Sequence, residues 1–303
     1  MFSSNQERLQ RAILEAITYF DVFSYPLTTL QVWQNLRTRT TYASVYEALK
    51  KSALLKKKLQ CVNGMWHLRG GDQCIKEREL RYRGSKSKVE KAVRFARLLQ
   101  WFPGIEAVYV CNSLGFLHAK SESDIDLFIV TRNGRIWSTR FFAVLLAELT
   151  GFRPKSDHAK DGLCLSFFAA SGAPMETLAL PNDVYYLYWM SKLRPVFARA
   201  EAQARFWRSN SWVHKELPQA EEIYPPKCVM VLKEQRGSGG WKIGDVIERI
   251  LRNVQMRIMP PYLKDAANKN TSVVVSDKFL KFHDHDKREQ YRKEYEARLA
   301  TVA

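Results

Sequence analysis

The feature that most constrains the fold is an apolar segment, residues 124–131, that begins with two acidic side chains. Its β-branched and aromatic residues predict a buried strand, in which successive side chains point to opposite faces. Asp124 and Asp126 therefore share one face, while Ile125 and Leu127 share the other. Two adjacent carboxylates on such a strand repel each other and lose hydration, and a divalent cation removes that cost. Because hard oxygen ligands suit Mg²⁺ (or Mn²⁺), the sequence predicts a metal site at Asp124 and Asp126.

A second apolar segment precedes the acidic pair and leads into a turn. Residues 105–111 predict another buried strand, which runs into Asn112-Ser113-Leu114-Gly115, and ten residues separate Ser113 from Asp124. An Asp-x-Asp pair alone is also found at exposed strand ends, so the alternative is a solvated strand terminus without a ligand. The preceding strand, the turn and the spacing together favour a ligand site.

Together, these segments resemble the signature of the polymerase-β-like nucleotidyltransferase superfamily over about residues 105–131. In that family a Gly-Ser or Gly-Gly turn grips a nucleoside triphosphate, and an Asp-hydrophobic-Asp pair holds two metal ions. The ions activate the attacking hydroxyl and neutralise the leaving pyrophosphate. The resemblance implies that Asp124 and Asp126 are catalytic residues and metal ligands, and that Ser113 contacts the β- and γ-phosphates. The nucleotide-binding residues that it implies are Asn112, Ser113, Gly115 and Ser123.

The sequence departs from the family pattern at two positions. Asn112 stands where the family's turn usually begins with Gly, but Asn tolerates left-handed backbone geometry, so the turn is still expected. The family's third carboxylate comes from a later strand, and the corresponding segment here, residues 163–168, contains no acid. Ser166 occupies that position, and Asp161 just upstream is the candidate substitute. Metal and nucleotide binding are therefore expected, whereas efficient transfer stays open.

The first 71 residues predict three helices followed by a hairpin. Apolar residues at helical spacing indicate a helix over 8–20, Thr28 is a candidate N-cap for a second one, and a third is expected from Tyr42 to Leu54. Asn63-Gly64 is a strong hairpin signal. This order resembles a winged helix-turn-helix, a module that binds nucleic acid or packs against protein. The nucleic-acid-binding candidates, at the end of the third helix and on the wing, are Lys56, Lys57 and Lys58.

The overall prediction is an α+β fold in which a nucleotidyltransferase core, a mixed sheet with flanking helices, follows the winged helix-turn-helix and precedes a helical C-terminal region. The expected divisions are 1–71 for the winged-helix-like domain, 72–104 for a linker and long helix, 105–180 for the core and 181–303 for the helical region. Helices are expected in the last region around 184–190, 199–207 and 246–258, and a flexible loop at 237–240. The aromatics of 184–190 are interpreted as core side chains, with stacking on a base as the alternative. His283 and His285 are a weak H-x-H metal motif.

Charge and cysteine usage narrow the class of protein. The 303 residues carry a net charge of +17, and the excess lies in the flanks: 15 basic against 7 acidic residues in 1–87, 11 against 9 in 88–180, and 22 against 15 in 181–303. Basic flanks favour a nucleic-acid partner (RNA or DNA), with a solvated surface as the alternative.

Five scattered cysteines, no secretory signal and no apolar run of membrane-spanning length predict a cytoplasmic protein without a membrane partner. The oligomeric state stays open.

Two functions follow from these patterns. The first is a Mg²⁺-dependent nucleotidyltransferase that moves NMP from NTP onto an unidentified hydroxyl acceptor, which includes the possibility of a toxin-like enzyme acting on tRNA or protein. The second, motivated by the missing third carboxylate and the basic flanks, is a catalytically impaired, nucleotide-sensing protein that binds nucleic acid.

Overall fold

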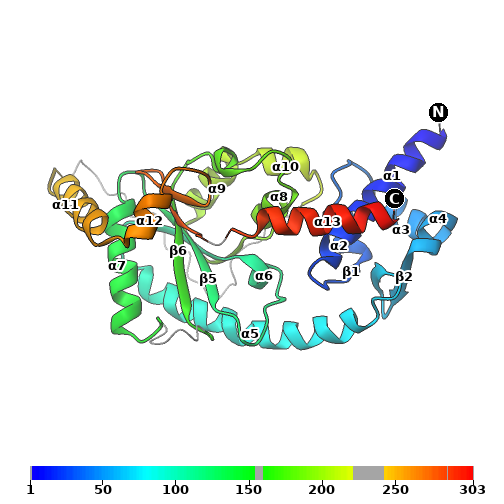
Figure 1. The fold of residues 1–303 in the computed structure, drawn as a ribbon, viewed down its shortest axis with the longest axis horizontal. Coiled ribbons are helices and arrows are strands. Elements are labelled where there is room, and N and C mark those ends of the chain that lie inside the picture. Colours follow the sequence, from blue (N-terminus) through cyan, green and yellow to red (C-terminus); the bar gives the residue numbers. More distant parts are fainter. Residues whose placement is uncertain (1, 154–159, 221–241, 285, 303) are drawn as a thin grey trace.

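The computed structural model describes residues 2–153, 160–220, 242–284 and 286–302. As predicted, the fold is α+β, with a mixed six-stranded sheet flanked by helices (Figure 1). The strand order is β7-β4-β5-β6-β9-β8, in which β5 and β6 are parallel and the other neighbouring pairs are antiparallel. The strands are β4 (Ile105–Val110), β5 (Ile125–Thr131), β6 (Leu163–Ala170), β7 (Arg194–Ala198), β8 (Val273–Val275) and β9 (Phe279–Phe282).

Both faces of the sheet are buried, which fixes the direction of the side chains on β5. Ile125, Leu127 and Ile129 pack on one face with apolar side chains of α5 and α7, as the alternation predicts. Phe128 and Val130 lie on the other face, where the Phe128 ring contacts aromatic rings of α8 and α9. Asp126 precedes Phe128 on this second face, so its carboxylate points toward α8. The helices named here are α5 (Gln73–Leu99), α7 (Ile136–Leu149), α8 (Val184–Ser191) and α9 (Ala200–Ser209).

The N-terminal block combines helices with a three-stranded sheet of order β1-β3-β2. Thr28 caps α2 as expected, because its hydroxyl accepts a hydrogen bond from the Gln31 backbone at 3.2 Å. The expected hairpin is also present, and Asn63 and Gly64 both have positive φ, 51° and 76°, as a two-residue hairpin turn requires. The block consists of α1 (Phe2–Asp21), β1 (Leu27–Thr28), α2 (Thr29–Gln34), α3 (Tyr42–Lys51), α4 (Ala53–Lys58), β2 (Leu59–Val62) and β3 (Met65–Leu68).

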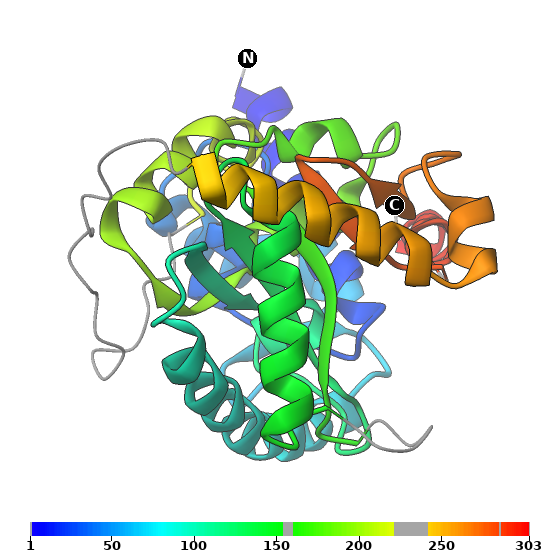
Figure 2. The ribbon, with the colours of Figure 1, turned by 90° about the vertical axis from the view of Figure 1, so that its left-hand side faces the viewer.

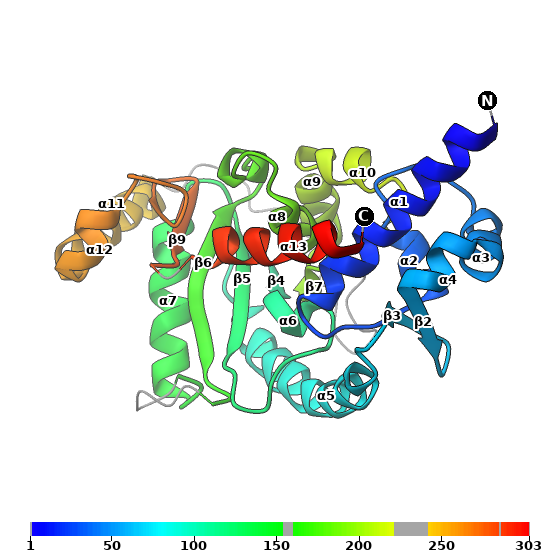
Figure 3. The same ribbon diagram turned by 45° about the vertical axis from the view of Figure 1, so that its right-hand side comes forward.

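The third helix of this block ends earlier than predicted. The expected helix through Leu54 is divided, because α3 ends at Lys51 and α4 begins after Ser52. Ser52 has an extended backbone, and its hydroxyl accepts a hydrogen bond from Leu55 N at 3.2 Å, so it caps α4 instead of continuing α3. Consequently Lys56–Lys58 form the last turn of α4 and do not belong to the wing. Figure 3 shows α4 at the N-terminal end of the molecule, far from β5 and β6.

The region after residue 180 is not wholly helical, in contrast to the expectation. β7, β8 and β9 from this region join the central sheet, and β9 lies between β6 and β8. These strands are three to five residues long, too short for their pattern to be distinguished from a helical segment. The expected loop at 237–240 lies outside the described residues. Besides α8 and α9, the helices here are α10 (Trp212–Glu216), α11 (Lys242–Ile258), α12 (Pro261–Ala266) and α13 (Arg288–Val302).

Two helices connect the N-terminal block to the sheet (Figure 1). α5 is continuous from Gln73, so the charged stretch 75–87, for which a connector or the start of a helix is expected, is helical. α13 runs back from the sheet to α1, where Arg298 Nε lies 3.3 Å from Asp21 Oδ2, and its Tyr291 ring stacks on Tyr185 of α8. Apolar side chains of the block and of the sheet form one continuous cluster. Within the described ranges, no helix combines the length and the apolar character needed to cross a membrane.

The N-terminus of α7 is capped by a residue more than one hundred positions away in the chain. Its own N-cap residue, Arg135, offers no side-chain acceptor. Instead, Glu248 of α11 accepts hydrogen bonds from Trp137 N at 2.7 Å and from Ser138 N at 3.0 Å. Figure 2 shows α11 crossing this end of α7. A carboxylate satisfies otherwise free N–H groups here and interacts favourably with the helix dipole.

We predict that Glu248→Ala lowers the free energy of unfolding by about 1–2 kcal/mol, because two buried N–H groups lose their acceptor. Urea denaturation followed by circular dichroism measures the change. Glu90→Ala, on an exposed position of α5, is the control and should change the value by less than about 0.5 kcal/mol. Equal effects of the two substitutions would contradict this role of Glu248.

Candidate functional site

Two carboxylates and a thiol converge where β5 begins. Asp124, Asp126 and Cys164 each bring one ligand atom to within 4.8 Å of the other two. The alternation in the sequence predicts that the two carboxylates lie together, and they do. Cys164 joins them because β5 and β6 are parallel and Cys164 is the register partner of Asp126. This cluster is the only group of three metal-ligating side chains among the residues that the structure describes.

Burial and mutual repulsion govern the electrostatics of this cluster. Burial, together with the neighbouring Asp124 charge, raises the pKa of Asp126 to about 6, and burial also raises the pKa of Asp124. Burial and the Asp126 charge raise the pKa of the Cys164 thiol to about 12, so the thiol is protonated at neutral pH. The donor set therefore fits a hard divalent cation such as Mg²⁺ through the two carboxylates, with a neutral thiol beside them.

Asn112 links the turn to the acidic pair. It has a φ of 53°, the left-handed conformation that the sequence allows for at this position. Its Nδ2 donates a hydrogen bond to Asp126 Oδ2 at 2.6 Å, and its Oδ1 accepts one from Trp189 Nε1 at 2.9 Å. Glycine lacks the side chain for either contact. Asn112, which stands where the family pattern has glycine, therefore donates a hydrogen bond to the Asp126 carboxylate that glycine could not make.

The other residues expected to bind nucleotide occupy different positions. Ser113 lies on α6 (Asn112–Gly115) and lines a cavity beside Asp126. Gly115 is buried, and a Cβ at this position would collide with the backbone oxygen of Lys192, so only glycine fits there. Ser123 precedes Asp124 in the loop, and its hydroxyl donates a hydrogen bond to Lys120 O at 3.0 Å. Ser123 thus shapes the loop and does not line the cavity.

The cavity beside Asp126 has a volume of about 420 Å³ and three kinds of wall. One edge carries the acidic pair through Asp126, with Cys164 next to it. Aromatic side chains of α8 form a second wall. Tyr186, Tyr188 and Trp189 are buried, as the interpretation of this segment as core predicts, and Tyr185 is half-buried. A third wall, from the segment that contains β9 and the start of α13 and from the end of α8, carries four cations and two acids, Asp284 and Asp286, of which Asp286 pairs with Lys281 and Arg288. Its cationic residues are Lys192, Lys281, Lys287 and Arg288.

Neither candidate for the third carboxylate position acts as an acid there. Asp161 Oδ1 lies 2.5 Å from Lys88 Nζ, which also donates to Ser123 O, so Asp161 fastens the loop before Asp124. Ser166 Oγ lies 2.8 Å from His283 Nε2 and accepts a hydrogen bond from Cys164 Sγ at 3.2 Å. The pairing of β5 with β6 shifts register between Asp126 and Phe128, which indicates a bulge in β6. The consecutive residues Ser166 and Phe167 both line the cavity there.

The sequence did not indicate that His283 belongs to this site. It stands out only as half of an H-x-H pair, and His285 lies outside the described residues. β9 brings His283 beside β6, a pairing that no local pattern predicts. Burial and the nearby Lys281 lower the pKa of His283 to about 4, so its ring is neutral at physiological pH. Lys281, which the sequence analysis also missed, is 4% exposed and donates to Thr271 O at 2.7 Å.

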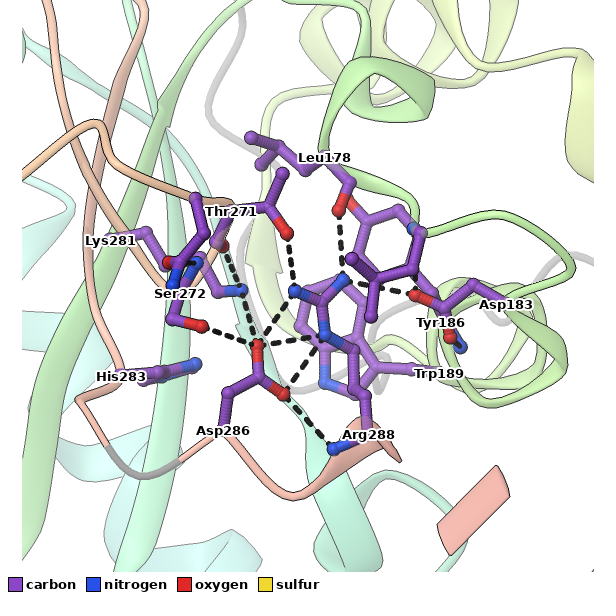
Figure 4. A network of polar contacts seen from close by, with 12 residues as sticks. Leu178, Asp183, Tyr186, Trp189, Thr271, Ser272, Lys281, His283, Asp286 and Arg288 are labelled. Atoms are coloured by element: carbon purple, nitrogen blue, oxygen red, sulfur yellow. Dashed lines mark hydrogen bonds and ion pairs between the residues drawn. The ribbon is translucent and has the colours of Figure 1, made fainter. Parts of the chain in front are cut away.

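A buried ionic network holds this C-terminal segment against α8 (Figure 4). Arg288 Nη1 lies 3.0 Å from Asp183 Oδ2, and Arg288 Nη2 lies 2.7 Å from Asp286 Oδ2. The same guanidinium donates to Leu178 O and to Thr271 Oγ1. Asp183 in turn caps α8 by accepting from Tyr186 N at 2.9 Å. Although burial opposes it, hydrogen bonding from Arg288 lowers the pKa of Asp286 to about 2.

We predict that Arg288→Met lowers the free energy of unfolding by about 3–5 kcal/mol at pH 7, because Asp183 loses the cation that it pairs with and Asp286 keeps only Lys281. The pKa of Asp286 lies below its ordinary value of 3.8, so its stabilisation is complete above pH 4 and is lost as the pH falls through 2. The loss caused by Arg288→Met should shrink over the same range. Denaturation at several pH values measures it, with Arg292→Met on α13 as the control. A pH-independent loss would contradict the role of the ion pair.

The fold and the site define an α+β protein with a carboxylate pair at the start of a central strand, facing a cavity with aromatic and basic walls. Comparison of the chain with protein-family models, with curated proteins and with solved structures finds no match. The resemblance to polymerase-β-like nucleotidyltransferases therefore rests on the motif in residues 105–131 alone.

Proposed function

We propose that this chain is a Mg²⁺-dependent nucleotidyltransferase that transfers NMP from NTP to a hydroxyl-bearing acceptor. The observation that carries the proposal is one cavity that Asp126 lines together with four cations, Lys192, Lys281, Lys287 and Arg288, against two further acids, Asp284 and Asp286, so that the cations outnumber the acids opposite Asp126. A volume of about 420 Å³ falls in the range of cavities that bind small molecules. A metal-bound polyphosphate complements such a cavity in two ways. Its metal cation binds the carboxylates, and its phosphate oxygens bind the basic side chains.

Each part of the nucleotide has a matching wall in this proposal. Asp124 and Asp126 hold Mg²⁺ (or Mn²⁺), which supplies charge neutralisation for the phosphates and for the leaving pyrophosphate. Ser113 and the turn that contains it face the triphosphate, and Lys281 balances its charge. Burial lowers the pKa of Lys281 to about 8, and an anionic ligand restores the charged form. The half-buried ring of Tyr185, on the aromatic wall, faces the base in this proposal.

The Ser166–His283 pair replaces the third carboxylate in this scheme. In the transfer step the acceptor oxygen forms a bond to the α-phosphorus, the bond between that phosphorus and the β-phosphate oxygen breaks, and pyrophosphate leaves with the electron pair. The proton of the acceptor hydroxyl passes to the hydrogen-bonded Ser166–His283 pair. The lowered pKa of His283, about 4, leaves its ring neutral but makes it a weak base, so proton transfer through this pair is expected to be slow.

We predict that Asp124→Ala/Asp126→Ala weakens Mg²⁺-dependent NTP binding by at least about tenfold, because the metal loses both carboxylate ligands. Calorimetric titration of ATP, GTP, CTP and UTP, with and without Mg²⁺, measures this. Glu122→Ala is the control, since Glu122 is an exposed carboxylate two residues from Asp124. Binding that is unchanged in the double variant would refute the proposal.

A second experiment tests transfer. The protein is incubated with cell extract and with NTP labelled at the α- or the γ-phosphate, and only the α-label should appear on an acceptor.

One observation favours a second function, a nucleotide-sensing protein that binds nucleic acid without efficient catalysis. Among the described residues, the third ligating group beside the acidic pair is the neutral thiol of Cys164, and Ser166 stands where the family pattern has an acid. A protein of this kind would bind NTP through the same carboxylates, and no label would appear on any acceptor in the extract experiment.

For this second function, we predict that replacing Lys56–Lys58 with Gln weakens binding to duplex DNA or RNA and lowers the slope of log affinity against log salt by about 0.9 per lost phosphate contact. Fluorescence anisotropy at several salt concentrations measures both quantities. The matched control replaces the exposed Lys264, Lys269 and Lys278, which removes the same charge elsewhere. An equal effect of both triple variants, or binding that does not depend on salt, would exclude α4 as the nucleic-acid-binding element.

A further inference from the structure

A second cavity, of about 270 Å³, lies between the N-terminal block, α5 and the connection from α8 to β7. It is separate from the cavity beside Asp126, although Phe116 and Lys192 line both. Its polar lining consists mainly of cations and amides, and no carboxylate lines it. The residues concerned are Arg78, Lys192, Arg194, Gln31, Gln34 and Asn35.

The three cations of this cavity have no acidic partner among the described residues. Arg78 donates to Gln31 Oε1 at 2.9 Å and to Pro26 O, and its guanidinium lies 4.3 Å from the centre of the Tyr25 ring. Arg194 uses Nε to donate to Gly115 O at 3.1 Å. Every acceptor that these two side chains use is thus a neutral oxygen, so their positive charges are uncompensated.

Lys192 adds a third positive charge at the inner end of the cavity. Burial and the charge of Arg194 lower its pKa to about 8, and burial also lowers the pKa of Arg194. Cations that gather in a partly buried space without counter-charge raise the free energy of the folded protein. An anion bound among them removes that cost and receives charge-assisted hydrogen bonds from the guanidinium groups.

We propose that this second cavity is a binding site for a phosphate group, held by Arg78 and Arg194 with the amide of Gln34 beside them. Arginine matches phosphate oxygens with paired donors, and amide N–H groups extend the same set of donors. A cavity of this size holds a phosphate together with a small organic group. The site does not depend on the nucleotidyltransferase proposal, because Arg78, Arg194 and Gln34 do not line the first cavity and Lys192 is the one cation that the two cavities share.

Gln34→Glu is the sharpest test, since it changes one amide group to a carboxylate of the same shape and puts an acid among the three cations. The structure gives the Gln34 side chain no hydrogen bond to lose, so the variant should fold. We expect the wild-type melting temperature to rise in a saturable manner with inorganic phosphate, and with pyrophosphate, at constant ionic strength. Gln34→Glu should melt at a higher temperature than wild type without phosphate and should lose the response to phosphate.

Three further variants separate this cavity from the rest of the molecule. Arg78→Met should weaken phosphate binding at least tenfold, whereas Arg83→Met, an exposed arginine on the same helix, should keep it. Asp124→Ala/Asp126→Ala should also keep it, even if nucleotide binding is lost. Absence of a saturable phosphate effect, or a phosphate effect that survives Gln34→Glu, would overturn the proposal. If instead only the double aspartate variant lost the effect, the phosphate would belong to the first cavity and the proposal would equally fail.

A competition experiment identifies the source of the phosphate. A 5′-phosphorylated oligonucleotide or its 5′-hydroxyl counterpart is added at increasing concentration to the protein. The measurement is whether inorganic phosphate still raises the melting temperature. Competition by the phosphorylated form alone supports the site and assigns it to a nucleic-acid end. Competition by neither, together with the phosphate effect and its loss in Gln34→Glu, supports a site for a small phosphorylated molecule.

Discussion

Burial of the Asp126 carboxylate on β5 is the constraint on which the surrounding structure depends. The carboxylate accepts a hydrogen bond from Asn112, whose amide is fixed in turn by the indole of Trp189 on α8. Asp183 caps α8 and pairs with Arg288 at the start of α13. One charged group on a central strand is therefore connected, contact by contact, to the last helix of the chain. A change in the turn, in α8 or at Arg288 is expected to reach the acidic pair through this series of contacts.

Features set by neighbours in sequence could be predicted, because local geometry determines them. The alternation of β5, the cap at Thr28 and the turn at Asn63-Gly64 require no knowledge of distant residues. The left-handed conformation of Asn112 is one that its residue type tolerates. The division between α3 and α4 was missed because Ser52, a residue with moderate helical tolerance, uses its hydroxyl to start a new helix instead.

The side chains that lie beside Asp126 could not be predicted, because they depend on pairings between distant strands. Cys164 faces Asp126 through the parallel register, a bulge in β6 directs Ser166, and β9 delivers His283 from the far end of the chain. The local sequence of β9, four residues with a lysine inside, carries no strand pattern that specifies this partner. Capping of α7 by Glu248 is distant in the same way.

The structure changes the meaning of the charge distribution in the sequence. The nearly neutral middle of the chain supplies the acidic pair, and the basic C-terminal region supplies the cations opposite it. Lys281 and Arg288 are buried and paired with Asp183 and Asp286, so these basic residues form a fixed lining and not a diffuse surface that attracts polyanions. Lys192 borders both cavities, and its backbone oxygen packs against Gly115 of the turn that contains Ser113. An anion in the second cavity and a ligand in the first would therefore act on the same lysine, which gives the two sites a physical route for coupling.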